Sequence, residues 1–517
     1  MNQKPSNHVS EPVRSDSQRP KKRRISKVKI LGLLLGPALM LITMFLPSGL
    51  EQEQQNLLAV IVVTVTFWVF QPLPIPVTSV LGLALCIIFN VAPASTVFGA
   101  FSSPTLFLLI GGFILTQSMS KYGLGQRIAL KALLLPGVAR STYRIIIVFG
   151  ALATLLSGVI DNGAVAAMLL PIALGLVKIF SSDVEEKGIN VNGATPLRLS
   201  SALLLITAYG ATLGALVTPF GDASNLVGWK FIQTEFDTDI SVLEWMAMGG
   251  PIVITMFAFL CGIILLVNRP EIGSLPNATT RIKNQLKAMG PMDRGEVNTL
   301  IAFCFAVTFW FLPPVIGMVV GKENVIYQFA SGQLPPSVVA ILAAALLFML
   351  PISREKGFTL RWRDTASMDW GPLLLVGSAL ALGTMMERTG LAQTLGQHIA
   401  GEIAGVGAIW VYIAAAALAI SMSELTSNLV SISVLVPIIP TLAVSGGGDP
   451  KAAALIATFA AIYGFMLPIS TSANAIVYSS GQIPFRRMVK TGLLVDLSGI
   501  AVVVTGVLLV VRWLNVL

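Results

Sequence analysis

Long apolar stretches, separated by short polar segments, run through almost the whole chain. A helix needs roughly 20 apolar residues to cross the hydrocarbon core of a bilayer. Several stretches come close to that length without a central interruption. We therefore predict an all-α polytopic membrane protein with about 11 transmembrane helices, near residues 28–47, 55–71, 77–92, 103–119, 199–217, 247–267, 297–315, 337–352, 371–386, 452–467 and 491–511.

Two further apolar stretches, 145–177 and 408–442, are interrupted near their middle by polar residues and then continue. The interruptions are Asp161-Asn162 and Ser427-Asn428. Each stretch is long enough for two short helical arms but suits one continuous helix poorly. We predict that both are re-entrant hairpins, because non-helical backbone at membrane depth is tolerated only where protein or a water-filled cavity surrounds it.

The two hairpins share one pattern of polar residues, which indicates an internal repeat. In each, an asparagine follows a serine after five residues, and a proline follows that asparagine after nine more. A second pair of motifs lies further along, and each has a proline six residues before an asparagine. The motifs are Ser157, Asn162 and Pro171, and Ser423, Asn428 and Pro437, in the hairpins; and TPFGDASN (218–225) and LPISTSAN (467–474) in two predicted broken helices, at 199–228 and 452–480.

Lysine and arginine are unevenly distributed between the segments that join the predicted spans. With the N-terminus inside and 11 crossings, the inner segments hold 29 of the 34 basic residues, which follows the positive-inside rule. The N-terminus is therefore predicted to be cytoplasmic and the C-terminus outside. The inner segments are 1–29, 120–144, 178–198, 268–296, 353–370 and 481–490.

This topology makes the two halves of the chain inverted relative to each other. One hairpin enters from the inside and the other from the outside. Inverted repeats with corresponding broken helices are typical of secondary transporters, whose sites lie near the bilayer midplane. The predicted organisation is a basic cytosolic tail (1–27), an extra helix (28–47), a first repeat (55–267), a cytosolic linker (268–296) and a second repeat (297–515).

The composition excludes several other classes of protein. The chain of 517 residues is 55% hydrophobic and 11% charged, whereas a soluble protein is about 25% charged. Its three cysteines all lie in apolar segments, so neither a disulfide framework nor a structural metal site is expected. Residues 1–26 are too long and polar for a signal peptide, and no nucleic-acid recognition motif is present. The only histidines are His8 and His398, so the sequence gives little support for histidine-based catalysis.

Four segments resemble the divalent anion/sodium symporter family, which carries dicarboxylates, citrate or sulfate. The strongest is FMLPISTSANAIV (465–477), which fits the family signature. The others are LFLLIGGFILTQSMSKYGLGQRIAL (106–130), MERTGLAQTLGQHI (386–399) and SELTSNLVSISVLVPI (423–438). The resemblance covers about residues 28–515. It implies a homodimer in the plasma membrane that works by an elevator-type movement of a transport domain against a scaffold.

The hairpin tips keep part of the family's Ser-Asn-Thr motif. Asn162, Asn428 and Ser427 are kept, whereas Asp161 replaces a serine, and Gly163 and Leu429 replace the threonines. The resemblance implies a substrate site between the tips, at Asn162, Gly163, Ser224, Asn428 and Ser472. It implies one cation near Ser157, Asp161, Asn162, Gly221 and Asp222, and another near Ser423, Thr426, Asn428 and Thr471.

Four acidic residues lie in or near predicted membrane segments: Asp161, Asp222, Glu424 and Asp496. An ionised aspartate at a helix centre costs about 2.5–3.5 kcal/mol on insertion scales, so such residues are functional candidates. Asp161 could cap the second hairpin arm, bind a cation or proton, or do both. Asp496 fits a structural partner better, and Glu424 stays open. Two acids in one half-site would repel an anion unless a cation binds first.

We therefore predict a secondary active transporter that couples a cation gradient to movement of a small anion across the bilayer. Na⁺ is the expected coupling ion and no other cofactor is expected; dicarboxylate is favoured over sulfate. Proton coupling or anion exchange is the alternative. A channel, or an intramembrane enzyme, has less support, since the sequence contains neither a His-Glu-x-x-His nor a Gly-x-Ser-x-Gly motif.

Overall fold

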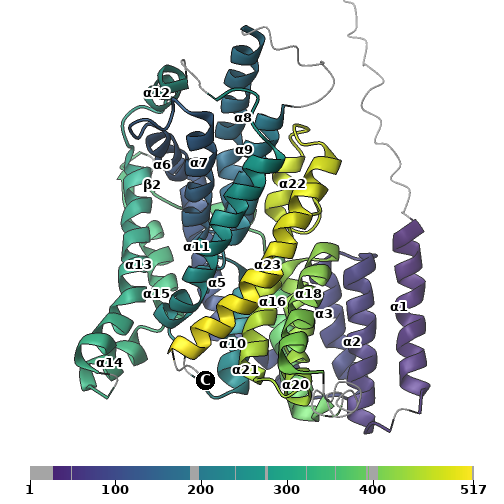
Figure 1. Cartoon of the computed structure of the whole chain (residues 1–517). Coiled ribbons are helices and arrows are strands. Elements are labelled where there is room, and N and C mark those ends of the chain that lie inside the picture. Colours follow the sequence, from purple (N-terminus) through teal and green to yellow (C-terminus); the bar gives the residue numbers. More distant parts are fainter. Residues whose placement is uncertain are drawn as a thin grey trace, which may run out of the picture.

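The computed structural model describes residues 27–514, apart from 48, 187–196, 239, 274–277, 322, 356, 392–393 and 395–405. His8, His398 and most of the basic tail lie outside these residues. The described part is a bundle of helices with one small β-hairpin (Figure 1). The first half contains α1 (Lys27–Phe45), α2 (Gln52–Phe70), α3 (Ile75–Ile88), α4 (Ala94–Gly99), the short 3-10 helix η2 (Ala100–Ser102), α5 (Pro104–Tyr122), α6 (Leu124–Leu133), α7 (Thr142–Ser157), α8 (Asn162–Glu186), α9 (Arg198–Gly214), α10 (Ala223–Glu235) and α11 (Val242–Val267).

The second half is also built mainly of helices, and it contains the β-hairpin. The antiparallel strands β1 and β2 form the hairpin, with Pro351 opposite Phe358. The elements are α12 (Ala278–Ala288), α13 (Arg294–Val320), α14 (Val325–Gln333), α15 (Pro336–Met349), β1 (Pro351–Ser353), β2 (Gly357–Phe358), the 3-10 helix η3 (Trp362–Ser367), α16 (Gly371–Thr389), α18 (Ala408–Leu425), α19 (Asn428–Leu435), α20 (Ile439–Ser445), α21 (Pro450–Ala460), α22 (Ser472–Tyr478) and α23 (Phe485–Leu514).

The predicted all-α, multi-pass fold is confirmed. Among the described residues, 6 helices are long and apolar enough to cross a membrane, or up to 9 if each bent pair counts as one span. Shorter apolar helices, such as α3 and α21, fill further predicted spans. Predicted and observed ends differ: the expected span 452–467 stops at Ala460, where the helix gives way to a turn and irregular backbone.

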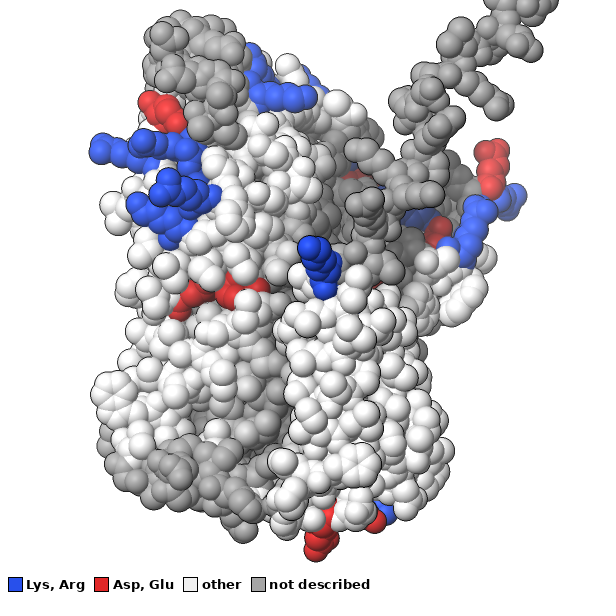
Figure 2. Space-filling model, turned by 90° about the vertical axis from the view of Figure 1, so that its right-hand side faces the viewer, with Lys and Arg blue, Asp and Glu red and all other residues white. Residues whose placement is uncertain are grey.

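Basic residues gather at one end of the molecule. Figure 2 shows Lys and Arg over the upper part of one face and few of them lower down. In Figure 1, α7 and the end of α8 lie in the upper half, and α18 to α20 lie in the lower half. The chain enters α1 at the upper end and leaves α23 at the lower end. The two interrupted segments thus reach the middle of the bundle from opposite ends.

Both predicted hairpins are broken where polar residues interrupt the apolar pattern. Residues 158–161 separate α7 from α8, and residues 426–427 separate α18 from α19. Capping side chains start the second arms: Asp161 Oδ1 accepts from the Ala164 N–H at 3.1 Å. In the other hairpin, Ser427 Oγ accepts from the Val430 N–H at 3.3 Å. Aspartate and serine favour such helix starts because their oxygens satisfy free N–H groups.

The two broken spans are closed in the same way. Asn225 Nδ2 donates to the carbonyls ten and seven residues earlier, those of Ala215 and Thr218, at 2.7 and 3.0 Å. Asn474 Nδ2 donates to the carbonyls at the same offsets, those of Gly464 and Leu467, at 2.9 and 3.0 Å. Each asparagine therefore satisfies carbonyls of its own unwound loop, which buried backbone requires. The matched spacing in the sequence corresponds to matched contacts.

Besides the six-residue α4, three helices lie wholly in segments that the hydropathy pattern left as loops. These three are α6, α12 and α14. They have 10, 11 and 9 residues and are too short to span a bilayer. Arg127 of α6 forms a buried ion pair with Glu296 of α13, with Nε and Oε1 2.7 Å apart and side chains 6% and 3% exposed. Arg127 Nη1 also donates to the Gly290 carbonyl at 2.8 Å. A charged residue thus holds α6 against the bundle.

We expect Arg127→Met to lower the free energy of unfolding by about 3–5 kcal/mol, because it leaves the Glu296 carboxylate buried without its partner. Lys121→Met is the control, since it removes the more exposed ion pair with Asp364, whose N–O distance is 2.8 Å. Exposed pairs contribute only about 0–1 kcal/mol. Thermal unfolding of the two variants in detergent measures the difference. Equal losses of stability would contradict the assignment.

Candidate functional site

The two hairpin tips and the two helix breaks meet around one cavity of about 630 Å³. Helices α3, α5 and α16 close its other sides. Its polar lining combines aspartates with amides and hydroxyls, and it includes no lysine, arginine or histidine among the described residues. The polar side chains that line it are Thr116, Gln117, Ser120, Asp161, Asn162, Asp222, Asp369, Ser427, Asn428, Ser470, Thr471 and Ser472.

Asp222 joins both hairpin tips. Its Oδ2 accepts a hydrogen bond from Asn162 Nδ2 at 2.8 Å and a longer one from Asn428 Nδ2 at 3.5 Å. Its Oδ1 accepts from the backbone N–H of Ser224 at 2.8 Å and from the Ser224 hydroxyl at 2.6 Å, which caps α10. Only 9% of the residue is exposed. Four donors around one buried carboxyl group fit its ionised form, since an ionised carboxylate only accepts.

The orientation of the two tip asparagines is fixed from behind. Ser472 Oγ donates to Asn162 Oδ1 at 3.0 Å, and Ser423 Oγ donates to Asn428 Oδ1 at 2.8 Å. Both amide oxygens are thereby engaged, so both amide nitrogens face Asp222. The tips consequently present N–H donors to a single carboxylate oxygen, which is an arrangement suited to binding a carboxylate.

The position of Asp161 is compatible with both roles considered from the sequence, capping a helix and binding a cation or proton. It caps α8 through the Ala164 N–H and also lines the cavity. The carboxyl groups of Asp222 and Asp369 are its electrostatic neighbours. Asp369, which is exposed, accepts from the Gly371 N–H at 2.9 Å at the start of α16. Asp161 therefore caps α8 and also faces a cavity that is lined by three carboxyl groups.

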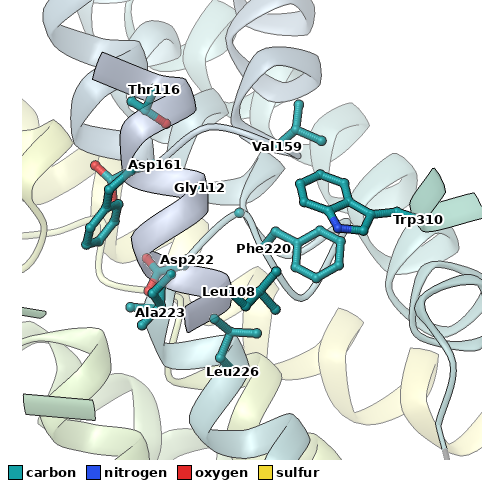
Figure 3. A pocket seen from close by; sticks show the side chains of 13 residues that line it. Leu108, Gly112, Thr116, Val159, Asp161, Phe220, Asp222, Ala223, Leu226 and Trp310 are labelled. Carbon is teal, nitrogen blue, oxygen red and sulfur yellow. The ribbon is translucent and has the colours of Figure 1, made fainter. Parts of the chain in front are cut away.

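A second, small cavity of about 20 Å³ shares Asp161 and Asp222 with the first. Figure 3 shows the side chains that line it. Its lining includes Asp161, Gly221 and Asp222. It also includes Phe220 and Trp310, whose ring centroids are 4.3 Å apart. A cavity of roughly 10–15 Å³ is enough for one water. The space therefore has the size for a single small ion beside two carboxylates.

The remaining predicted site residues lie in the packing around the cavity. Gly163, Ser224, Ser157, Ser423 and Thr426 are buried and do not line it. Ser157 Oγ donates to the Ile160 carbonyl at 3.2 Å, and Thr426 Oγ1 donates to the Met422 carbonyl at 2.7 Å. Thr471 lines the cavity and caps α22, accepting from the Asn474 N–H at 3.1 Å.

Gly221 and Gly163 are explained by space. A Cβ at Gly221 would lie 2.6 Å from the Ser157 carbonyl oxygen, and one at Gly163 would lie 2.8 Å from Ser472 Cβ. Both distances are shorter than real Cβ contacts allow. Gly163 thus lets the two halves of the site approach each other, and Gly221 lets the first hairpin pack against the first helix break.

The sequence did not single out the wall that the tips face. Thr116, Gln117 and Ser120 of α5 and Asp369 before α16 line the cavity as well. A signal existed for α5, because four of the five residues at 116–120 are polar near the end of an apolar span. Asp369 gave none, because it lies in a charged loop where another acid is ordinary.

Comparison with known proteins decides what kind of protein this is. The sodium:sulfate symporter transmembrane region matches residues 27–517. The chain belongs to this family. It is therefore a multi-pass membrane transporter and not an enzyme, and the family resemblance found in the sequence is confirmed.

One relative of this chain is the sodium-dependent dicarboxylate transporter SdcS of Staphylococcus aureus (strain bovine RF122 / ET3-1). It is 29% identical over 493 residues, covering 94% of this chain and 92% of the relative. SdcS of Staphylococcus saprophyticus is 28% identical over 487 residues, covering 92% and 90%. Among solved structures, the YdaH transporter of Alcanivorax borkumensis has a TM-score of 0.52 at 11% identity, covering 95% of this chain and 98% of that one. This last likeness concerns the fold alone.

Proposed function

We propose that the protein couples a Na⁺ gradient to the movement of a small dicarboxylate across the plasma membrane. The cavity between the hairpin tips carries the main argument. Three aspartates line it and no basic side chain does, within the described residues. An anion entering this space meets like charges, so cations must bind with it. The SdcS relatives, named as sodium-dependent dicarboxylate transporters, support both the ion and the substrate.

The first cation binds beside Asp161 and Asp222, in the small cavity that Gly221 also lines. Oxygen ligands near a helix break suit a hard cation, and Ser157 and Asn162 lie in the same hairpin turn. The second cation binds behind the other tip, near Ser423, Thr426, Asn428 and Thr471. Its support is the matched geometry of the second half, where the Ser423 hydroxyl and the Asn428 oxygen meet at 2.8 Å.

Cation binding prepares the substrate site. Asp222 Oδ2 now accepts from the amides of Asn162 and Asn428. A cation that draws the Asp222 carboxylate toward itself frees both amides to donate to a substrate carboxylate. Ser472 lines the cavity and its hydroxyl donates to the Asn162 amide oxygen, so it completes the proposed substrate site. Gly163 and Ser224 support this site from behind the cavity wall, Gly163 against Ser472 and Ser224 against Asp222. Binding is therefore ordered, with the cation first.

Transport follows an elevator-type movement in a homodimer, with the two hairpins and two broken spans in the moving domain. The matched hydrogen bonds of Asn225 and Asn474 support a structural repeat between the two halves of the chain. The inverted orientation of the repeat is supported by the hairpins, which enter from opposite ends of the bundle. The N-terminus is cytoplasmic and the C-terminus outside. The support for this orientation is the charge bias, with 29 of 34 basic residues in the inner segments.

Sulfate is the second candidate substrate, because it appears in the description of the family. Proton coupling and anion exchange are the alternative modes of transport. A dicarboxylate fits better here, because the relatives that match almost the whole chain are named for it.

Purified protein in proteoliposomes tests the proposal. Uptake of radiolabelled succinate should be saturable and at least tenfold faster with an inward Na⁺ gradient than with K⁺ or choline. Unlabelled sulfate in excess should compete weakly, and a proton gradient alone should not drive uptake. Uptake that runs equally without Na⁺, or that requires an exchangeable internal anion, would overturn the coupling. Labelled sulfate transported faster than succinate would overturn the substrate.

A further inference from the structure

Two more carboxyl groups, those of Glu424 and Asp496, are buried outside the cavity. Glu424 is 3% exposed and Asp496 is 5% exposed. Glu424 lies near the end of α18, in the second hairpin, and Asp496 lies on α23. The loop between α21 and α22 contacts both of them. The proposed transport cycle uses neither group.

Among the described residues, no basic side chain forms an ion pair with Glu424 or Asp496. The ion pairs in the described part of the chain are Lys121 with Asp364 and Arg127 with Glu296, and neither involves Glu424 or Asp496. The two carboxyl groups accept from adjacent backbone N–H groups, Asp496 from Phe465 at 3.3 Å and Glu424 from Met466 at 2.6 Å, so they lie close together. Two ionised carboxylates at that distance in a buried site repel strongly, and one of them takes up a proton instead.

The donors around the pair are unequally shared. Glu424 accepts from the Met466 N–H at 2.6 Å, the Leu467 N–H at 2.9 Å and the Ser470 hydroxyl at 2.5 Å. Asp496 Oδ1 accepts only the Phe465 N–H, at 3.3 Å, and Asp496 Oδ2 has no hydrogen-bond partner in the described structure. Glu424 thus has the surroundings of a carboxylate, and Asp496 has those of a neutral acid.

The other titratable groups near Asp496 supply no positive charge. They are two fully buried tyrosines, Tyr209 and Tyr463, on packed segments next to it. The Tyr209 hydroxyl donates to the Met488 carbonyl at 3.3 Å. The Tyr463 hydroxyl is buried without a partner. A buried polar atom without a partner is costly, and a proton on Asp496 would supply one of the missing donors in this cluster.

We propose that Glu424 and Asp496 form a proton-binding site that holds one proton, carried by Asp496 and donated to Glu424. The proton removes one of the two negative charges and gives the pair its own hydrogen bond. It also links α18, α23 and the loop between α21 and α22 through one cluster. The proton is resident in the folded protein and is distinct from the ions that enter the cavity.

The site belongs to the second half of the chain alone. By the repeat spacing, Gly158 stands where Glu424 stands, one residue after the matched serines. In the first half the Thr218 hydroxyl donates to the Gly158 carbonyl and ties the hairpin to the helix break. In the second half the Glu424 carboxyl group links the hairpin to the helix break, because it accepts from the N–H groups of Met466 and Leu467. A carboxylate there creates the need for a proton that its counterpart does not have.

The cluster is one side chain away from the cavity. Ser470 lines the cavity and also donates to Glu424. Protonation of the pair therefore sets how firmly the wall of the second half-site is held. This inference does not depend on the substrate, so it is tested on the purified full-length protein without any anion or Na⁺.

Infrared difference spectroscopy tests it directly. Wild-type protein at pH 7 should show the carbonyl band of a protonated carboxyl group, shifted by D₂O, that is absent from Asp496→Asn. Asparagine is isosteric with the neutral acid and can still donate to Glu424, so this variant should fold. Asp496→Ser, which also keeps a donor, serves if the asparagine variant does not fold. Retention of the whole band in the folded variant would overturn the proposal.

The pH dependence of Tm gives an independent readout. An unfolded aspartate releases its proton above about pH 4, whereas the folded protein would keep this one. Stability therefore falls with rising pH until the proton leaves the folded state. From pH 5 to pH 8 the Tm of Asp496→Asn should rise steadily relative to that of wild type. Parallel Tm curves would overturn the proposal.

Asp449→Asn is the matched control for both measurements. Asp449 caps α21 and accepts from the N–H groups of Lys451 and Ala452 at 2.7 and 3.0 Å, so its carboxylate already has its donors. The control should keep the wild-type infrared band, and its Tm should not rise relative to wild type with pH. A band lost equally from the control would overturn the assignment to Asp496.

Discussion

Asp222→Asn is expected to weaken the apparent affinity for Na⁺ by about 10- to 100-fold. Hydrogen bonds and contacts of charged groups contribute about 1.5–3 kcal/mol, and each 1.4 kcal/mol is tenfold. Asp222 is the only acceptor that both tip asparagines share among the described residues. Asparagine caps helices about as well as aspartate does, so α10 should still start at Ala223. The loss should therefore reflect charge and not misfolding.

The measurement is succinate uptake in proteoliposomes as a function of external Na⁺, with the thermal stability of each variant as the check on folding. Ser224→Ala is the matched control, since it removes one of the donors to Asp222 and leaves the carboxylate in place. It should change the Na⁺ dependence several-fold less. An unaltered Na⁺ dependence in Asp222→Asn would place the first cation elsewhere.

Asp161→Asn should also lower the apparent Na⁺ affinity, by about tenfold or more, because it removes the second carboxylate beside the small cavity. The cap on the Ala164 N–H survives in asparagine, so α8 should keep its start. If both acids bind the same cation, the double variant with Asp222→Asn should lose less than the sum of the two single losses, since coupled groups are not additive.

Asp369→Asn is the control for the second prediction. Asp369 lines the same large cavity but is exposed at its rim, where salt screens its field. We expect its Na⁺ dependence to change less than threefold at physiological ionic strength. Coupling that survives intact in Asp161→Asn, or an equal loss in Asp369→Asn, would show that general negative charge matters and a specific ion contact does not.

The sequence predicted the parts of the site that depend on local rules. Apolar spans, helix breaks and capping residues follow from length, periodicity and side-chain chemistry within a few residues. The tips at Asp161 and Ser427 begin helices in the structure as capping chemistry requires. The repeat spacing of Asn225 and Asn474 also corresponds to a local contact, since each bonds carbonyls within ten residues.

What the sequence could not predict depends on contacts between distant segments. The bonds from Asp222 to Asn162 and Asn428 join residues 60 and 206 positions apart. The pairing of Glu424 with Asp496 and the position of Asp369 at the cavity rim have the same character. No periodicity encodes such contacts, because they arise when whole helices pack. The short helices α6 and α12 were not predicted, because helices of 10 and 11 residues that are buried on one side leave no apolar stretch long enough to cross a membrane.

The bonds of Asn225 and Asn474 also bear on how the protein is made. Each asparagine closes its unwound loop with carbonyls from its own span, no more than ten residues away. Contacts this close in sequence form early and quickly, because little chain entropy is lost in closing them. Each broken helix can therefore take its shape as its own half is synthesised and inserted, before the opposite hairpin exists. Both broken helices would then be folded when synthesis ends, and only the packing of the two halves against each other would require the complete chain.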